Sequence, residues 1–270
     1  RMKNFVTYRI SATLQLLTFF FIAVLAFPPP DYEPHPTPHA LKDEEWPDFF
    51  NVPVLMLMLI TLLNDGTLIA IGYDNVIPSK IPENWNLRAV FAVSGVLALV
   101  ALISSLFLLW CGLDSWRDNG VFQGMGLGGL KYGQIVTMVY LKVAVSDFLT
   151  LFSSRTFDHF FWESMPSPIL LGAASVALVA STIIACAWPE SKPDGIPALG
   201  LAYRTPKELA LYVWIYCLVW WLIQDCAKVA FVRLMYKHNW FGVKNTMHRV
   251  ESNTLAVTVV EEESKGEDRV

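Results

Sequence analysis

Charged residues are scarce in this sequence. Asp, Glu, Lys and Arg together make up 16% of its 270 residues, while 54% are hydrophobic. Soluble domains usually carry about 25% charged residues, which cover the outside of the fold. The mean hydropathy of +0.43 reflects the same imbalance. A chain with so much apolar surface and so little charge must expose part of that surface to lipid, so the sequence predicts a membrane protein.

The sequence also lacks an excess of basic residues and any paired spacing of cysteines. A formal net charge of -4 and a pI near 5.7 exclude a predominantly basic nucleic-acid-binding protein. The four cysteines lie in or beside apolar stretches and form no Cys-x-x-Cys pair: Cys111, Cys186, Cys217 and Cys226. This pattern is typical of neither a disulfide framework nor a zinc site, and we expect no metal centre.

Long apolar segments are what the sequence does contain. A helix needs roughly 20 apolar residues to cross a bilayer core about 30 Å thick. The first segment, which follows Arg1 and Lys3, is also a candidate signal peptide, but Arg9 and Gln15 interrupt it and no small-residue cleavage site precedes Pro28. Counted as a span, it gives an all-α fold, a polytopic bundle of six transmembrane helices. The predicted spans are residues 5–27, 50–71, 89–112, 133–153, 168–188 and 209–232.

The spans predict one membrane domain over residues 1–236, followed by a disordered polar tail at 237–270. Between spans, residues 28–49 are rich in proline and acidic residues, residues 72–88 predict a structured turn, and residues 120–133 predict an irregular glycine-rich loop. An even number of spans places both termini on one side. Assigning that side to the cytoplasm gives it nine basic residues against six, in the direction of the positive-inside rule.

Asp65 lies about two-thirds of the way along the second, otherwise apolar span, in the sequence Asn64-Asp65-Gly66-Thr67. An ionisable residue at membrane depth is costly and usually functional. Gly66 is a poor helix former, and Asn64 and Asp65 can bond locally to backbone groups, so we expect the helix to loosen here. Broken helices of this kind form ion sites in transporters, which makes Asp65 the main candidate for ion binding. The alternative is an Asp that only supports the fold.

Arg9 in the first span is the natural counter-charge for Asp65. A nearby cation favours an ionised carboxylate and desolvation disfavours it, so alternation between the two environments suits a proton carrier. Alternatively, Arg9 extends to the headgroups, since it lies only a turn and a half from Lys3, and the sequence does not choose between these roles. Gln15, about 9 Å further along the helix axis, can hydrogen-bond but carries no charge.

Two further spans contain both an acidic and a basic residue: Lys142 and Asp147 in the fourth, and Asp225 and Lys228 in the sixth. Asp225 and Lys228 are three residues apart and can meet on one helix face. We interpret these residues as internal ion pairs that fix helix packing, and Lys142 is the strongest candidate for more because it lies nearest mid-membrane. Hydroxyl residues in the spans are expected to form interhelical hydrogen bonds: Thr61, Thr67, Ser104, Ser105 and Ser146.

Several motifs resemble the plasma-membrane proton-pumping P-type ATPases, over the C-terminal membrane half that holds their fifth to tenth transmembrane helices. The resemblance covers about residues 1–240. The matching sequences are Arg1-Met2-Lys3-Asn4 and Tyr8-Arg9-Ile10 in the first span, Asn64-Asp65-Gly66-Thr67 in the second, Tyr73-Asp74-Asn75 and Trp85-Asn86-Leu87 in the loop after it, and Asp225, Lys228 and Arg233 in the last.

This resemblance implies a role for the second span in proton transport. Asp65 would be the intramembrane proton acceptor and donor, with Asn64 and Arg9 beside it. Gln15 stands where plant members have an arginine that acts as a positive plug and fungal members have a histidine, so the plug role does not carry over. Arg9 instead matches an arginine of the fungal pattern. Gln15, Lys142, Asp147, Asp225 and Lys228 are kept as possible supporting residues.

The motifs of the family's cytoplasmic domains are missing from this sequence. It has no Asp-Lys-Thr-Gly-Thr phosphorylation motif, no Thr-Gly-Glu motif and no nucleotide-binding domain. We therefore expect no catalytic residue or cofactor in this chain, which as given cannot hydrolyse ATP; ATP and Mg²⁺ would bind in a missing N-terminal half of the pump. The other expected partners are the transported proton and the lipid bilayer, at the plasma membrane, with both termini cytoplasmic. The alternative is a free-standing, non-enzymatic six-span protein derived from the pump, which serves as an assembly partner or passive pathway.

Overall fold

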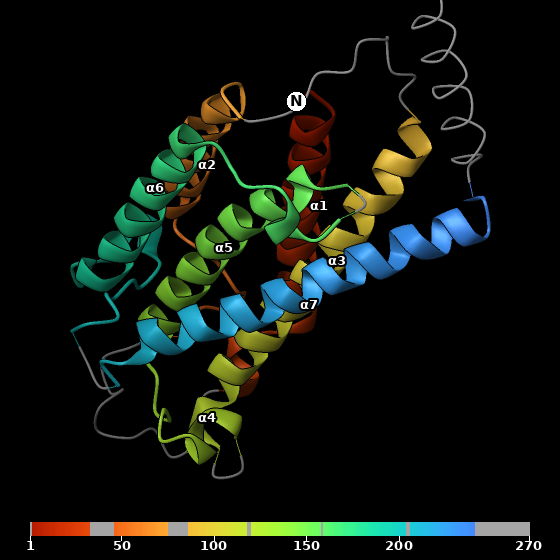
Figure 1. The fold of residues 1–270 in the computed structure, drawn as a ribbon. Helices are drawn as coiled ribbons and strands as arrows, with labels where there is room; N and C mark the ends of the chain where they lie inside the picture. The colour runs from red at the N-terminus through yellow and green to blue at the C-terminus, as the bar shows by residue number, and fades with distance from the viewer. Residues whose placement is uncertain are drawn as a thin grey trace, which may run out of the picture.

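The computed structural model describes residues 2–32, 46–74, 86–117, 120–157, 159–203 and 206–240. These residues form six long helices, each long and apolar enough to cross a membrane, and no named strand. The all-α prediction is therefore confirmed (Figure 1). The six helices are α1 (Met2–Ala26), α2 (Val54–Ile71), α3 (Leu87–Leu113), α5 (Tyr132–Arg155), α6 (Pro168–Ala187) and α7 (Leu209–Lys237).

The helix ends differ from the predicted spans where local chemistry decides them. Pro53 is the N-cap of α2, so this helix begins four residues later than the predicted 50. Its ring clashes with a helical conformation of the preceding residue, which keeps Val52 outside the helix. The polar last turns of α7 continue the helix to Lys237, five residues beyond the predicted 232.

The glycine-rich connection at residues 120–133 is more regular than predicted. It contains the short helix α4 (Val121–Gly124), and two glycines after it have positive φ angles: Gly126 at 73° and Gly129 at 80°. Glycine adopts these angles without steric cost, which lets the chain turn back onto the bundle. The Trp116 indole N–H then donates to the Leu130 carbonyl at 2.7 Å, so the connection is packed against the end of α3.

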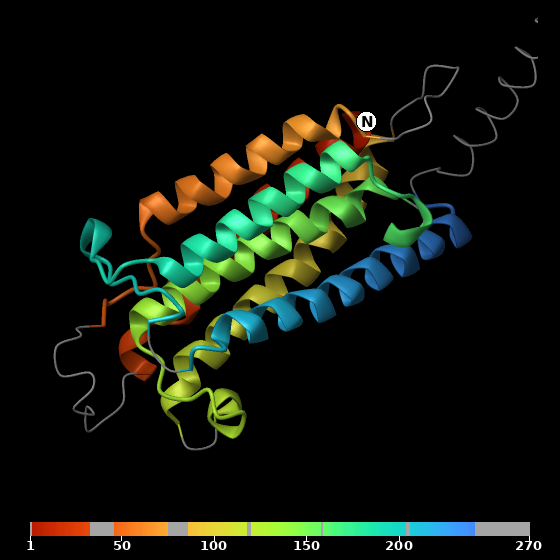
Figure 2. The same cartoon turned by 60° about the vertical axis from the view of Figure 1, so that its left-hand side comes forward.

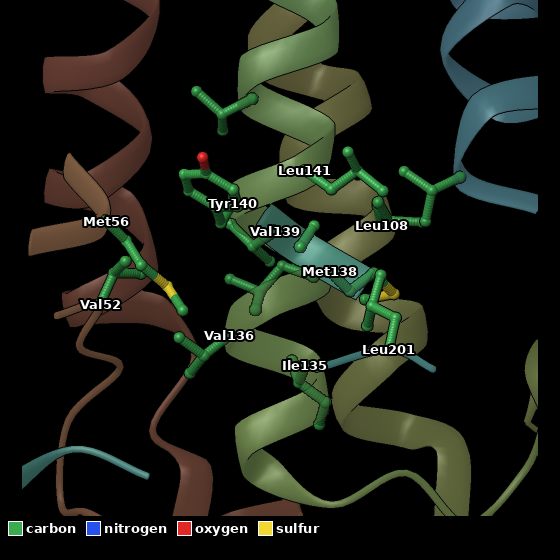
Figure 3. Close-up of a cluster of buried hydrophobic side chains, with 14 of the residues drawn as sticks. Val52, Met56, Leu108, Ile135, Val136, Met138, Val139, Tyr140, Leu141 and Leu201 are labelled. Atoms are coloured by element: carbon green, nitrogen blue, oxygen red, sulfur yellow. The ribbon is translucent and has the colours of Figure 1, made fainter. Parts of the chain in front are cut away.

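Helix α5 is the centre of the bundle. It packs against α1, α2, α3, α6 and α7, and nearly all of its residues are buried. In Figure 3 its side chains supply most of the buried cluster, where Val136 and Met138 lie among residues from neighbouring elements such as Met56 of α2 and Leu108 of α3. The outer helices instead expose large apolar side chains, as expected for lipid contact: Leu62, Ile69, Val176 and Leu211.

The beginning of α1 and the end of α7 lie at the same end of the bundle (Figure 2). At this end, called the Met2 end, the Asn4 side-chain amide donates to the Arg155 carbonyl at 3.0 Å. At the opposite end, called the Tyr132 end, the Tyr132 hydroxyl donates to the Asn51 carbonyl at 3.2 Å. The predicted turn at 72–88 and the tail at 237–270 fall mostly outside the described residues.

Candidate functional site

Arg9 and Asp65 form an ion pair between α1 and α2. One Arg9 guanidinium nitrogen (Nη1) lies 2.5 Å from Asp65 Oδ1. The two residues can meet because they lie at similar distances from the Met2 end of the bundle. Arg9 is seven residues from Met2, and Asp65 is six residues from Ile71. At 1.5 Å per residue, both lie about 10 Å from the Met2 end. Of the two roles that the sequence left open for Arg9, the structure favours the partner of Asp65 over the headgroup contact.

This ion pair faces the outside of the described bundle. The side chain of Arg9 is 46% exposed and that of Asp65 is 54% exposed. The surrounding side chains on α2 are apolar and also exposed, with Leu62 at 69% and Ile69 at 74%. Ionisable side chains within membrane spans are costly, and they usually face protein or a water-filled cavity. The surface around this pair is therefore the candidate for a functional contact.

The expected loosening of the second span is wrong for this structure. Helix α2 is continuous from Val54 to Ile71, through Asn64, Asp65 and Gly66. The Thr67 hydroxyl donates to the Leu63 carbonyl at 3.0 Å, which satisfies a polar side chain without breaking the helix. A single glycine lowers helix stability by only about 1 kcal/mol, which the packing of α2 against α5 and α6 can offset. Asp65 is thus presented by a regular helix.

Asn64 turns inward where Asp65 turns outward. Its amide nitrogen (Nδ2) donates to Asp147 Oδ2 of α5 at 2.9 Å, and both side chains are buried. Tyr8 of α1 is also buried, and its hydroxyl interacts electrostatically with Asp147, Arg9 and Asp65. The structure therefore brings Asn64 and Asp147 together beside the exposed ion pair. This contact joins residues 83 positions apart in the chain.

Lys142 and Asp147 do not form the predicted ion pair with one another. The Lys142 ammonium donates to the Ala101 carbonyl of α3 at 3.0 Å and to the Ser105 hydroxyl. The two residues are five positions apart on α5, a spacing that places them on different parts of the helix surface. Lys142 is held by neutral oxygens of α3, and Asp147 by Asn64 of α2. The four charged residues therefore include one ion pair of the predicted kind rather than two.

That one pair is Asp225 and Lys228, which stand on the same face of α7. The Lys228 Nζ lies 2.7 Å from Asp225 Oδ1, and both side chains are at most 1% exposed. Lys228 also donates to the carbonyls of Ser153 and His159, each at 3.0 Å, and so ties α7 to the end of α5. The geometry supports the interpretation of this pair as a packing device.

Gln15 is buried in α1, 2% exposed, and its amide nitrogen (Nε2) has no hydrogen-bond partner among the described residues. It lies six residues beyond Arg9, too far along the helix to join the ion pair with Asp65. Of the hydroxyl residues predicted to bond across helices, Ser105 does so, by accepting from Lys142. Thr61, Thr67 and Ser104 bond to carbonyls of their own helices instead. Short hydroxyl side chains reach the carbonyl one turn earlier, which competes with the predicted interhelical bonds.

One buried ion pair was missed in the sequence. The Arg155 guanidinium binds Asp74 in a bidentate manner, with Nε–Oδ2 at 2.6 Å and Nη2–Oδ1 at 2.8 Å. Asp74 Oδ1 also accepts the Ser167 backbone N–H at 3.2 Å. The pair joins the ends of α2, α5 and α6 at the Met2 end. In the sequence, Asp74 closely follows one apolar run and Arg155 ends another. This position does not indicate that the two residues pair with each other.

Among the described residues, no group of three His, Cys, Asp or Glu side chains is placed to hold a metal ion. The charged groups at the site are therefore one exposed ion pair and one buried carboxyl beside it. The arrangement thus places one carboxylate within a span, in contact with a cation of the neighbouring helix and open to the outside of the described bundle.

Comparison with known proteins supports the resemblance seen in the sequence. The chain is 52% identical over 236 residues to the probable proton ATPase 1A of Leishmania donovani, and 51% identical over 236 residues to the probable proton ATPase 1B of the same organism. It is 26% identical over 233 residues to a putative cation-transporting ATPase of Methanocaldococcus jannaschii. No protein-family model matches the chain.

The matches cover most of this chain but a small part of the relatives. The aligned region is 85% of this chain and 23% of the length of each Leishmania protein. For the archaeal protein the shares are 86% and 24%. The chain thus spans about a quarter of the length of these relatives. Together with the six apolar helices, the similarities confirm the predicted resemblance to the membrane region of a P-type proton ATPase.

Proposed function

We propose that this chain provides the intramembrane proton-binding site of an ATP-driven, proton-exporting P-type pump. The observation that carries the proposal is the Arg9–Asp65 ion pair, which holds a carboxylate at membrane depth on a helix that is otherwise apolar. A carboxylate beside a cation stays ionised, and separation of the two side chains would favour its protonation. Movement of α1 against α2 would therefore change the proton affinity of Asp65.

The exposed position of the pair supports a further part of this proposal. Because charged side chains do not face hydrocarbon without cover, we propose that the surface of α1 and α2 around Arg9 and Asp65 packs against the remaining part of the pump. That N-terminal half would bind ATP and Mg²⁺. We further propose a plasma-membrane location with both ends of the chain on the cytoplasmic side.

Replacement of Asp65 by Asn tests the carrier role. Asn has nearly the same size but cannot take up and release a proton, so ATP-driven proton transport should fall to background in Asp65→Asn. The measurement is acidification of vesicles that contain the native protein, isolated from its own membrane. Glu208→Gln at the start of α7 removes an exposed carboxylate far from the ion pair and is the matched control.

Transport that survives in Asp65→Asn would contradict the carrier role. Arg9→Gln extends the same assay, because loss of the guanidinium should displace the pH dependence of transport while Asp65 still carries the proton. An isolated native polypeptide near 30.4 kDa with no ATP dependence would instead favour the free-standing six-span alternative.

A further inference from the structure

Asn64 and Asp147 leave two buried acceptor atoms without a hydrogen-bond donor. One contact between them is complete, since Asn64 Nδ2 donates to Asp147 Oδ2 at 2.9 Å. The two remaining oxygens, Asn64 Oδ1 and Asp147 Oδ1, are buried and have no hydrogen-bond partner among the described residues. The side chains are only 5% and 3% exposed, so bulk water does not reach these atoms.

The two orphaned atoms belong to the two groups that already share one hydrogen bond. An amide oxygen only accepts, and an ionised carboxylate oxygen also only accepts. The amide and the carboxyl together therefore lack one donor. A single proton on Asp147 Oδ1 would supply that donor. The carboxylic acid and the amide could then form a cyclic pair, in which each group donates one hydrogen bond and accepts one.

Asp147 is buried, and no cation among the described residues lies at ion-pair distance from it. A buried carboxylate is costly unless it is paired and fully hydrogen-bonded. Lys142 is engaged with the Ala101 carbonyl and Ser105 of α3 rather than with Asp147. The other charged residues on α5 and on the helices packed against it belong to the pairs Arg9–Asp65, Asp225–Lys228 and Arg155–Asp74 or lie near helix ends. Those near the ends are Lys3, Arg88, Arg233 and Lys237. Helix α6, which also contacts α5, contains no charged residue.

We propose that Asp147 and Asn64 form a second, buried proton-binding site, separate from Asp65, in which one proton is shared between the carboxyl oxygen and the amide oxygen. The ligand is a proton, and the site joins α5 to α2 directly beside Asp65. Loss of this proton would leave two acceptors facing one another and weaken the contact between α2 and α5. The site does not require Asp65 to carry a transported proton, so the two proposals can fail independently.

Tyr8 offers the competing arrangement. Its buried hydroxyl has no hydrogen-bond partner among the described residues and interacts electrostatically with Asp147. Rotation of this hydroxyl towards an ionised Asp147 would also satisfy the carboxylate. The two arrangements differ in the protonation state of Asp147, which infrared spectroscopy reads directly.

The test is the infrared absorption of the purified full chain in lipid nanodiscs at neutral pH. A buried, protonated Asp147 should give the C=O stretching band of a carboxylic acid. Asp147→Asn should remove that band, and Asp65→Asn should leave it, because the band belongs to Asp147. Asn64→Leu should shift the band to higher frequency, since the acid loses its amide partner.

The outcomes separate the alternatives. A band that disappears in Asp147→Asn and shifts in Asn64→Leu supports the second site. If no carboxylic acid band is present, or if the band is unchanged in either variant, the proposal is wrong. An absent acid band combined with a clear loss of stability in Tyr8→Phe would assign an ionised Asp147 that accepts from the tyrosine.

Discussion

Two ion pairs among the described residues are buried, and neither lies at the proposed transport site. Asp74 and Arg155 join α2 to α5, while Asp225 and Lys228 stand on α7. Backbone groups form additional hydrogen bonds with both pairs, which compensate for the loss of water around the charges: the Ser167 N–H donates to Asp74, and Lys228 donates to the Ser153 carbonyl. The Arg9–Asp65 pair is different, because about half of each side chain is exposed. The buried pairs therefore hold the helices together, whereas the half-exposed Arg9–Asp65 pair remains accessible to a proton or to a partner.

Arg155→Met should destabilise the bundle by about 3–5 kcal/mol, because it leaves Asp74 as a buried charge without its partner. The measurement is unfolding of the purified protein by titration with a denaturing detergent, at fixed lipid content. Arg233→Met on the exposed side of α7 is the matched control and should leave the midpoint nearly unchanged. Equal midpoints for the two variants would show that the buried pair contributes no stability.

At the scale of elements, α2 combines a regular helix with a glycine next to its carboxylate. A Cβ atom added to Gly66 would meet no other heavy atom within 4 Å. Gly200, in the connection after α6, is in the opposite situation, because a Cβ there would lie 2.6 Å from the backbone oxygens of Cys186 and Trp188. The first glycine is free of packing constraints and the second is required by a close approach of two backbone segments.

Gly66→Ala should therefore raise stability by about 0.5–1 kcal/mol, the usual gain for alanine over glycine within a helix. Gly200→Ala should lower stability, by about 1–3 kcal/mol, since the added methyl group forces the backbone apart. The same detergent titration measures both. A loss of stability in Gly66→Ala would indicate that α2 is not a continuous helix in solution and would revive the expectation that it loosens at Asp65.

The sequence was sufficient for the fold, since six apolar runs define the helices. It named Arg9 as a candidate partner of Asp65 but did not decide between that contact and the headgroups, because equal depth does not make two helices neighbours. It was not sufficient for the contacts of α5. Arg155 meets Asp74, and Asn64 meets Asp147, across separations of 81 and 83 residues that no local pattern encodes. Lys142 was misassigned for the same reason, because its partners belong to α3.

At the scale of the whole molecule, the outer surface is not uniform. Most of it is apolar, as for Val176 of α6 with 71% exposure, and suits lipid. On α1 and α2, the charged Arg9–Asp65 pair interrupts this apolar surface. The chain spans about a quarter of the length of its Leishmania relatives. Under the proposed function, the surface around Arg9 and Asp65 is where further protein of the pump would pack.

A photo-crosslinking amino acid placed at Leu62, one turn from Asp65 and 69% exposed, should react mainly with protein in the native membrane. The same group at Val176 should react mainly with lipid, and it is the control for probe chemistry and depth. Crosslinked products are identified by mass spectrometry after separation from the lipid fraction. Predominant lipid adducts at both positions would contradict the proposed packing surface.

The central position of α5 has a consequence for how the protein is made. This helix contains Lys142 and Asp147 within its span, and it contacts five other helices but almost no lipid. Released alone into hydrocarbon, each of these charges would cost about 2.5–3.5 kcal/mol. The groups that hydrogen-bond to them in the bundle, Ala101 and Ser105 of α3 and Asn64 of α2, precede α5 in the chain. During synthesis from the N-terminus, these groups are therefore made before α5 leaves the insertion machinery, so the order of the helices favours assembly.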